Sequence, residues 1–143
     1  MHKTISALID KDLPLISNLS NLSACLNSLL DNINWVGFYL KDNKGLYLGP
    51  FQGEVACYRI PFHKGVCGEC LDKKETIVVD DVLIYPNHIA CSAKSRSEIV
   101  IPLFKDDEVV ALLDIDAPIK GRFSNKDKEE LEKVAREIEV LFK

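Results

Sequence analysis

The residues best suited to chemistry in this sequence are its five cysteines, Cys25, Cys57, Cys67, Cys70 and Cys91. Because five is an odd number, they cannot all pair within one chain, and at least one thiol is free or bound to another molecule. In a reducing compartment, clustered cysteines serve as buried hydrophobes, metal ligands or redox catalysts rather than as a disulfide framework. The cysteine count leaves these three interpretations open.

Two short cysteine motifs have spacings that could serve metal binding or redox chemistry. Cys67 and Cys70 form a Cys-Gly-Glu-Cys motif, and His88 and Cys91 follow as a His-x-x-Cys pair. A structural zinc site could use these four ligands. A redox role is the competing interpretation, because a helix that begins near Gly65 would favour a thiolate at Cys67. Zinc is the weaker hypothesis, since the apolar strands around both pairs supply enough core for folding without a metal.

Three carboxylates lie in segments that otherwise have the pattern of interior strands. Glu98 precedes one apolar run, and Asp114 and Asp116 interrupt another. Strand alternation puts both aspartates on one face, where burial and repulsion are unfavourable without a cation, a metal or hydrogen-bond donors. That face also carries Val110 and Leu112, and the opposite face carries Val109, Ala111, Leu113 and Ile115. The three acids therefore line one polar pocket or mark a solvated strand end.

Two aromatic side chains, Trp35 and Tyr39, are four residues apart in an aromatic run and share one face of the predicted strand. Aromatic residues in strands usually belong to the core, but aromatic rings also form the walls of pockets for apolar or sulfur-containing ligands. The pattern alone does not decide between the two. Cys25 falls within the apolar stripe of a predicted helix, which favours core packing for that thiol.

The elements that must position these side chains are helices near both ends of the chain and strands between them. Apolar residues recur at helical spacing over 15–33, a short helix is expected near Gly65, and the last helix opens with Ser124 and Asp127 arranged as a capping box. Alternating apolar runs predict strands at 35–40, 46–51, 55–61, 76–79, 98–104 and 108–116. Residues 80–95 have no periodicity, and long loops of this kind are often functional. This order predicts an α+β domain with a largely antiparallel sheet.

Composition narrows the class of protein. A chain of 143 residues with 47% hydrophobic and 28% charged residues predicts a single globular domain over residues 1–143. The net charge of -4 gives no reason to expect nucleic acid or anionic lipid as a partner. The sequence has neither a signal-peptide pattern nor the ~20 consecutive apolar residues that span a bilayer. A cytoplasmic protein without membrane contact is therefore expected.

Six short motifs carry a resemblance to a known family. They are Asn-Trp-Val-Gly-Phe-Tyr at 34–39, Gly-Pro-Phe-Gln-Gly at 49–53, Gly-Val-Cys-Gly at 65–68, Asp-Val at 81–82, His-Ile-Ala-Cys at 88–91 and Ser-Arg-Ser-Glu-Ile-Val-Ile-Pro at 95–102. Together with the spacing of Cys57, Cys67 and Cys91, they resemble the free methionine-(R)-sulfoxide reductases, which are single GAF domains. An ordinary GAF domain would share the sheet and helices but not this cysteine set.

The resemblance implies a GAF-like α+β fold, with a six-stranded antiparallel sheet flanked by the N- and C-terminal helices. The ligand pocket would lie on the other side of the sheet, closed by the loop around Cys91. The implied activity is reduction of free L-methionine (R)-sulfoxide to L-methionine by a cytoplasmic, thioredoxin-dependent oxidoreductase that counters oxidative stress. Free methionine (R)-sulfoxide and thioredoxin would be its partners, no cofactor or metal would be bound, and a homodimer is compatible with the family.

The same resemblance implies a role for each cysteine. Cys91 would be the catalytic nucleophile that becomes a sulfenic acid, Cys57 the main resolving cysteine that forms a disulfide with it, and Cys67 a secondary or alternative partner. The sequence does not settle whether Cys57 or Cys67 is the dominant resolving cysteine. Cys70 matches no functional position. If residues 55–61 form a strand, Arg59 shares a face with Cys57 and favours its thiolate.

The acids and aromatic residues would form the substrate site. Trp35 would pack on the ε-methyl group of the substrate, and Tyr39 would shape the pocket. One of Glu98, Asp114 and Asp116 would protonate the departing oxygen, and the same carboxylates would pair with the α-ammonium group, which methionine within a polypeptide lacks. The sequence does not choose the proton donor among the three.

Two other classes of function stay open. A GAF sensor would bind a small ligand and switch through cysteine oxidation without catalysis. A zinc module would use Cys67, Cys70, His88 and Cys91 as ligands.

Overall fold

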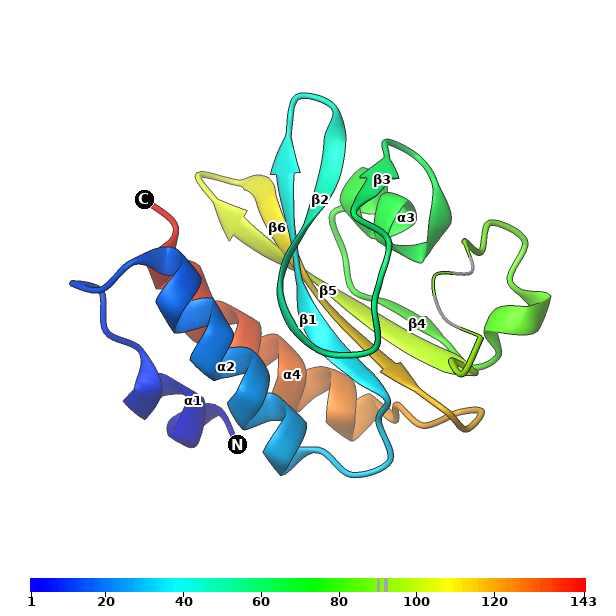
Figure 1. Ribbon diagram of the computed structural model, residues 1–143, viewed down its shortest axis with the longest axis horizontal. Coiled ribbons are helices and arrows are strands. Elements are labelled where there is room, and N and C mark those ends of the chain that lie inside the picture. The colour runs from blue at the N-terminus through cyan, green and yellow to red at the C-terminus, as the bar shows by residue number, and fades with distance from the viewer. Residues whose placement is uncertain (90, 92) are drawn as a thin grey trace.

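The computed structural model describes residues 1–89, 91 and 93–143, which form an α+β fold around one six-stranded sheet. The strand order is β3-β2-β1-β6-β5-β4, and every neighbouring pair is antiparallel (Figure 1). The strands are β1 (Trp35–Asp42), β2 (Gly45–Gly53), β3 (Arg59–Pro61), β4 (Ile77–Val79), β5 (Ser97–Lys105) and β6 (Glu108–Ala117). The predicted six-stranded antiparallel sheet is confirmed.

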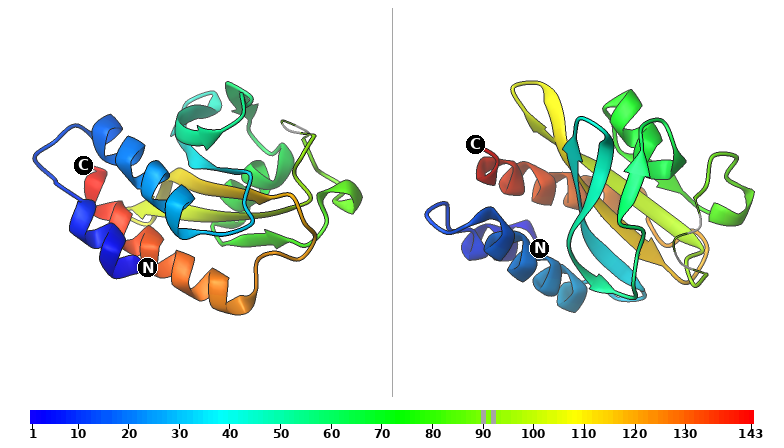
Figure 2. Two further views of the ribbon diagram at one scale, coloured as in Figure 1. Left: turned by 60° about the horizontal axis from the view of Figure 1, so that its bottom comes forward. Right: turned by 45° about the horizontal axis from the view of Figure 1, so that its top comes forward.

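Helices α2 (Leu15–Leu29) and α4 (Asn125–Ile138) pack on one face of the sheet, and α1 (His2–Leu8) packs against these two helices on the same side (Figure 2). The predicted capping box begins α4, because the Ser124 side chain accepts a hydrogen bond from the Asp127 backbone and the Asp127 side chain accepts one from Ser124 N. The main core lies between these helices and the sheet; its largest fully buried members include Leu19, Leu22, Leu26, Phe38, Ile99, Ile101, Leu103 and Leu113.

The helical predictions differ from the structure at the N-terminal end. The helix expected over 15–33 ends at Leu29, because Leu30 is extended and Asn32 has a φ of 54°, which turns the chain into β1. Helix α1 was not predicted, since its seven residues bury only Ile5 and give too short a pattern for helical periodicity. Cys25 is half-buried against the main core, as its place in the apolar stripe predicts.

A second core covers the opposite face of the sheet. It is built on α3 (Gly65–Lys73), together with β3, β4 and the short 3-10 helix η1 (Val82–Ile84); a further 3-10 helix, η2 (Glu139–Leu141), follows α4. The short helix predicted near Gly65 is therefore confirmed, and it lies on the face away from the other helices. Members of this core include Trp35, Tyr39, Val66, Cys67, Cys70, Leu71, Val100 and Leu112.

Two strand predictions are wrong in detail. Of the strand predicted over 55–61, only Arg59–Pro61 pairs with β2, and residues 54–58 form an irregular segment. In β6, the register with β5 shifts opposite Leu103 and Phe104, so Val110 is skipped. Because of this bulge, Val109 joins the same core as Leu112 instead of the opposite face.

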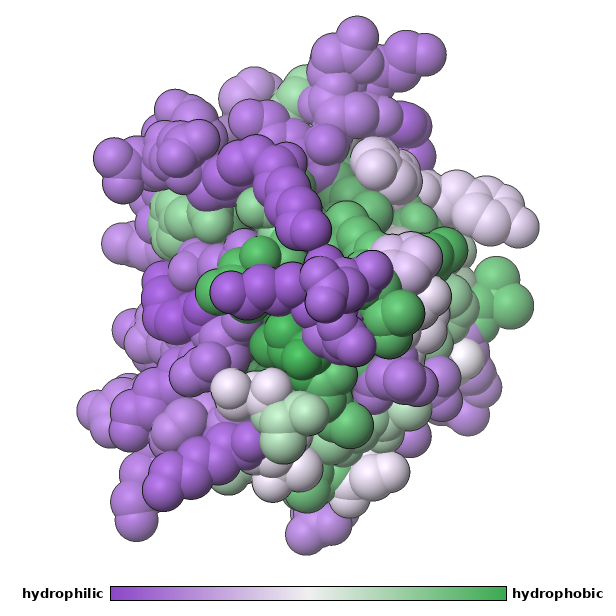
Figure 3. Space-filling view, turned by 90° about the vertical axis from the view of Figure 1, so that its left-hand side faces the viewer, coloured by the Kyte–Doolittle hydropathy of each residue, from purple (hydrophilic) through white to green (hydrophobic). Residues whose placement is uncertain are grey.

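The surface on the side of α1 and α2 is largely hydrophilic and contains one apolar strip (Figure 3). A groove between α2 and β2 is lined by Leu15, Ile16 and Leu19 from the helix and by Leu48, Pro50 and Phe51 from the strand. Within the described part of the chain, no helix combines the length and apolar character needed to cross a membrane.

Candidate active site

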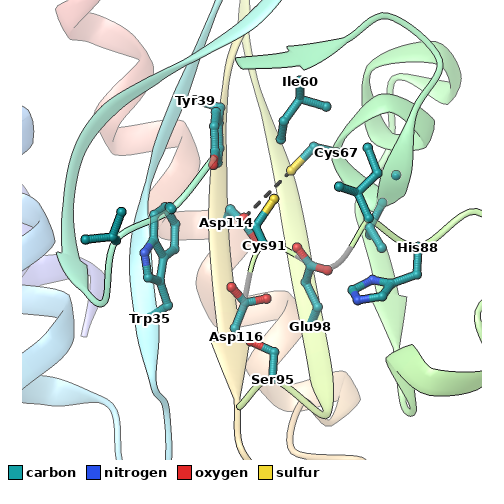
Figure 4. Close-up of a pocket in the computed structure, with 15 residues that line it drawn as sticks. Trp35, Tyr39, Ile60, Cys67, His88, Cys91, Ser95, Glu98, Asp114 and Asp116 are labelled. Atoms are coloured by element: carbon teal, nitrogen blue, oxygen red, sulfur yellow. Dashed lines mark hydrogen bonds between the residues drawn. The ribbon is translucent and has the colours of Figure 1, made fainter. Parts of the chain in front are cut away.

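A small pocket lies on the face of the sheet that α3 covers (Figure 4). Its volume is about 50 Å³, which is room for only a few water molecules. Seven residues that the sequence predicted for the site line it: Trp35, Tyr39, Cys67, Cys91, Glu98, Asp114 and Asp116. They come from β1, α3, the segment before β5, β5 and β6, so the fold brings together side chains that are distant in sequence.

A disulfide joins Cys91 to Cys57, and their Cα atoms are 5.5 Å apart. Cys91 lines the pocket from the segment between η1 and β5, whereas Cys57 lies in the irregular segment between β2 and β3. Both residues are half-buried. The cysteine pair expected from the family resemblance therefore meets at the edge of the pocket.

The three acids are brought together by the register of two strands. Glu98 on β5 is directly opposite Asp116 on β6, and Asp114 lies two residues earlier on the same face of β6. Burial raises the pKa of all three carboxyl groups, and the charge of Asp114 raises the pKa of Glu98 and of Asp116 further. At least one of the three therefore holds a proton well above the pH at which a solvated carboxyl loses it.

The acid cluster has spare hydrogen-bonding capacity. Oδ1 of Asp114 is buried and accepts no hydrogen bond from any described residue. No lysine or arginine is found among the described residues that line the pocket. A buried carboxylate oxygen without a partner is costly, so the cluster is suited to a ligand that brings a cation or hydrogen-bond donors.

The two aromatic residues form one wall of the pocket. The Trp35 and Tyr39 rings stack with their centroids 6.0 Å apart, and Phe51 stacks on Trp35 at 5.1 Å. Trp35 Nε1 donates to the Glu54 carbonyl at 3.2 Å, and Tyr39 Oη donates to the Cys57 carbonyl at 3.0 Å. The wall therefore also holds the segment that carries Cys57.

Comparisons with known proteins place this geometry in a family. A family profile described as GAF domain matches residues 18–142. The free methionine-R-sulfoxide reductase of Escherichia coli (strain K12) is 40% identical over 141 residues, which cover 99% of this chain and 86% of the relative. The structure of fRMsr of Staphylococcus aureus in complex with substrate is 51% identical with a TM-score of 0.93, covering 99% of this chain and 93% of that one. The chain belongs to the free methionine-R-sulfoxide reductase family of GAF domains.

A second solved member of this reductase family has the same fold. The free methionine-R-sulfoxide reductase from Neisseria meningitidis, in complex with its substrate, is 41% identical with a TM-score of 0.93, and the match covers 99% of this chain and 85% of that one. The sequence-based assignment to this family of oxidoreductases is therefore confirmed.

The third reductase cysteine, Cys67, is buried beneath the pocket. Its Sγ donates to Asp114 Oδ2 at 3.7 Å, and burial, followed by the charges of Asp114 and Glu98, raises the pKa of the thiol well above its usual value. The expectation that the N-terminus of α3 makes Cys67 a thiolate is therefore wrong. Cys70 is fully buried, and its Sγ donates to the Val100 carbonyl at 3.6 Å.

The four residues of the zinc hypothesis do not form a ligand set in this reductase. Cys91 is bonded to Cys57, and Cys70 faces Val100. Among the described residues, the group whose ligand atoms all lie within 4.8 Å of one another consists of Cys67, Glu98 and Asp114. The two cysteines of the Cys-x-x-Cys motif therefore occupy separate positions on α3, Cys67 beside Asp114 and Cys70 beside Val100.

Sequence reasoning missed part of the reductase pocket. Ile60, Val66, Ile89 and Ser95 line it. The last three lie within the family motifs, but their apolar or small side chains gave no reason to single them out as site residues. His88, considered only as a zinc ligand, also lines the pocket; its Nδ1 is buried without a partner among the described residues, and burial lowers its pKa. Arg59, expected beside Cys57, instead makes two hydrogen bonds to Asp42, at 2.9 and 2.7 Å.

Proposed function

We propose that this chain reduces free methionine (R)-sulfoxide to methionine, with Cys91 as the nucleophile and Cys57 as the resolving cysteine. The observation that carries the proposal is the Cys57–Cys91 disulfide beside a pocket lined by three buried acids and an aromatic wall. Two relatives that cover nearly the whole chain were solved with substrate and support this assignment.

The two steps that end in the disulfide need no reactant other than the substrate, a proton and these two cysteines. The Cys91 thiolate attacks the sulfoxide sulfur, a proton is delivered to the sulfoxide oxygen, and methionine leaves while Cys91 becomes a sulfenic acid. The Cys57 thiol then attacks the Cys91 sulfur, the disulfide forms, and the oxygen leaves as water. The disulfide that the structure holds is the product of this second step.

The acid cluster supplies the proton. Glu98 is the strongest candidate donor, because burial and the charges of both aspartates raise its pKa. Protonated Glu98 keeps a hydrogen available at neutral pH, which a solvated glutamate does not. Asp114 and Asp116 would then bind the α-ammonium group of the substrate, whose positive charge offsets their burial. This pairing favours a free amino acid over methionine in a peptide.

The aromatic wall provides the contacts for the substrate side chain. Trp35 would pack against the ε-methyl group, and Tyr39 would shape the pocket beside it. The Tyr39 hydroxyl is committed to the Cys57 carbonyl, and burial raises its pKa, so Tyr39 stays protonated and serves as a wall rather than as a base.

The disulfide must be reduced for a second turnover, and we propose thioredoxin as the external dithiol. Exchange with a dithiol protein restores both thiols without any bound cofactor. A cytoplasmic location fits this electron source. A homodimer is compatible with the family, and the catalytic groups proposed here all come from one chain.

The experiment that tests this function compares three substrates under thioredoxin, thioredoxin reductase and NADPH. Free methionine (R)-sulfoxide should be reduced, and the free (S)-sulfoxide and a sulfoxide-containing peptide should be reduced at least a hundredfold more slowly. Equal rates for the peptide would contradict the role of the ammonium group. Tight binding of the (R)-sulfoxide without methionine formation would instead favour a sensor.

A further inference from the structure

The segment between β2 and β3 exposes two large apolar side chains beside the disulfide. Val55 and Tyr58 flank Cys57 in the sequence, and 83% and 81% of their surfaces are exposed. Val55 also lines the pocket, whereas Tyr58 does not and has no role in the proposed reduction of the substrate. Scattered exposed apolar residues are common, so exposure alone does not make these two a binding surface. What distinguishes them is that hydrogen bonds hold the segment in place and that Cys57 lies between them.

Hydrogen bonds to three of its carbonyl groups hold this segment in place. The acceptors are the carbonyls of Glu54, Cys57 and Tyr58, and the donors are Trp35 Nε1 at 3.2 Å, Tyr39 Oη at 3.0 Å and Leu48 N at 2.9 Å, respectively. At the start of β3, the paired Arg59 and Asp42 side chains fix the end of the segment. The backbone therefore presents Val55 and Tyr58 outward in a preformed arrangement, which lowers the entropic cost of binding a partner.

The two sulfur atoms of the disulfide differ in their surroundings. Cys91 lines the pocket beside the acids, whereas Cys57 is absent from the pocket lining and lies in the exposed segment. The segment crosses the face of the sheet between β2 and β3 (Figure 1). Cys57 therefore offers a sulfur atom outside the pocket lining, between the exposed side chains of Val55 and Tyr58.

A salt bridge joins the two loops that carry the disulfide. Lys94 Nζ lies 2.6 Å from Glu54 Oε1, and both side chains are largely exposed. This pair adds no net charge beside the exposed apolar side chains of Val55 and Tyr58. Such a surface fits a protein partner better than a small charged reductant.

We propose that residues 55–58 are the docking surface for the dithiol protein that reduces the disulfide, and that the partner's thiolate attacks Sγ of Cys57. This proposal rests on the proposed function. The partner is defined by its chemistry: a dithiol oxidoreductase whose nucleophilic cysteine is surrounded by apolar surface that covers Val55 and Tyr58.

The exchange proceeds in two balanced steps. The partner's thiolate forms a bond to Cys57 Sγ, the Cys57–Cys91 bond breaks, and Cys91 leaves with the electron pair as a thiolate in the pocket. The partner's second thiol, as its thiolate, then attacks the first partner sulfur, and Cys57 leaves and takes up a proton. The partner is oxidised to its disulfide, both cysteines of this chain are reduced, and the nucleophile is regenerated where the substrate binds.

The first test separates docking from chemistry. In Tyr58→Ser, kcat/KM for thioredoxin should fall about fivefold or more, while turnover driven by dithiothreitol stays within about twofold of the unmodified protein, because Tyr58 does not line the pocket. Ile16→Thr is the matched control, because Ile16 is an apolar residue with 66% of its surface exposed on α2, in the helical layer on the other face of the sheet. An unchanged kcat/KM for thioredoxin in Tyr58→Ser would overturn the docking surface.

The second test identifies the attacked sulfur. A thioredoxin variant that lacks its resolving cysteine should form a mixed disulfide with the oxidised protein, and peptide mass spectrometry should place the adduct on Cys57. An adduct on Cys91, or none, would overturn the assignment. Failure of the proposed function is separate, since it would appear as no methionine from the unmodified protein even with dithiothreitol.

Discussion

Cys67 donates its thiol hydrogen to Asp114 beneath the pocket, with 3.7 Å between Sγ and Oδ2. The contact ties a redox-capable residue to the acid cluster without making it reactive, because burial and the neighbouring carboxylates raise the pKa of the thiol. Cys67 therefore serves as a hydrogen-bond donor that orients Asp114 in the resting enzyme. The cysteine that we propose as the nucleophile is the half-buried Cys91.

This arrangement predicts unequal reactivity among the thiols. In the reduced protein, iodoacetamide at pH 7.5 should modify Cys91 at least tenfold faster than Cys67, as measured by timed alkylation and peptide mass spectrometry. Cys70, which is also buried with a raised pKa, is the internal reference for an inert thiol. Modification of Cys67 at the rate of Cys91 would show that its thiolate is accessible and would contradict the assigned role.

The acid cluster predicts a conflict between stability and function. Asp114→Asn should raise the free energy of unfolding of the ligand-free protein by about 1 kcal/mol at pH 7.5, or a few degrees in Tm, because it removes a buried charge. The same substitution should lower kcat/KM at least tenfold. Asp107→Asn in the exposed turn between β5 and β6 is the control and should leave both unchanged. A lower Tm for Asp114→Asn than for that control would refute the claim.

The raised pKa of Glu98 also predicts a pH dependence with a definite sign. Above its ordinary value of 4.5, the folded state holds a proton that the unfolded state has lost. The free energy of unfolding should therefore decrease as pH rises from about 4.5 through the raised pKa of the folded state. In Glu98→Gln that decrease should be smaller, measured as Tm across pH 5 to 9. Identical slopes in both proteins would contradict a buried, protonated Glu98.

The disulfide predicts that the oxidised protein excludes substrate. The pocket beside Cys91 has a volume of about 50 Å³, so we expect the disulfide-bonded form to leave too little room for an amino acid. Calorimetric titration with free methionine (R)-sulfoxide should give binding to reduced Cys91→Ser and at least tenfold weaker binding to the oxidised unmodified protein. Similar affinities in the two proteins would mean that the disulfide does not close the site.

The aromatic wall predicts a separable effect of the Trp35 ring and its N–H group. Trp35→Ala should raise KM about tenfold, corresponding to about 1.4 kcal/mol of lost contact with the substrate side chain. Trp35→Phe keeps a ring but loses the hydrogen bond to Glu54, so KM should stay within about threefold. Steady-state kinetics with thioredoxin measures both. If the two variants were equally impaired, the hydrogen bond rather than the ring would be responsible.

Much of the site was predictable because it follows from local pattern. Alternation in residues 108–116 correctly placed Asp114 and Asp116 on one face, and the four-residue spacing placed Trp35 and Tyr39 together. The family resemblance, carried in part by the spacing of Cys57, Cys67 and Cys91, implied the Cys57–Cys91 pair, which the disulfide joins. These features depend on periodicity or on a short motif, both of which can be read without knowing tertiary contacts.

The remaining features depend on tertiary contacts that no local pattern encodes. The pairing of Glu98 with Asp116 is set by the register of β5 and β6, which includes a bulge. Arg59 was assigned to Cys57 by alternation, but it pairs with Asp42 because the strand begins only at residue 59. The helix dipole predicted a reactive Cys67, yet the cost of burying a thiolate beside carboxylates is the larger effect.

A single-turnover experiment tests the central claim most directly. The protein is reduced, freed of reductant and mixed with excess free methionine (R)-sulfoxide, and methionine and disulfides are quantified, with Cys25→Ser as the matched cysteine control. The account predicts about one equivalent of methionine and one equivalent of the Cys57–Cys91 disulfide in both proteins, and no methionine from Cys91→Ser. Undiminished methionine formation by Cys91→Ser would contradict it.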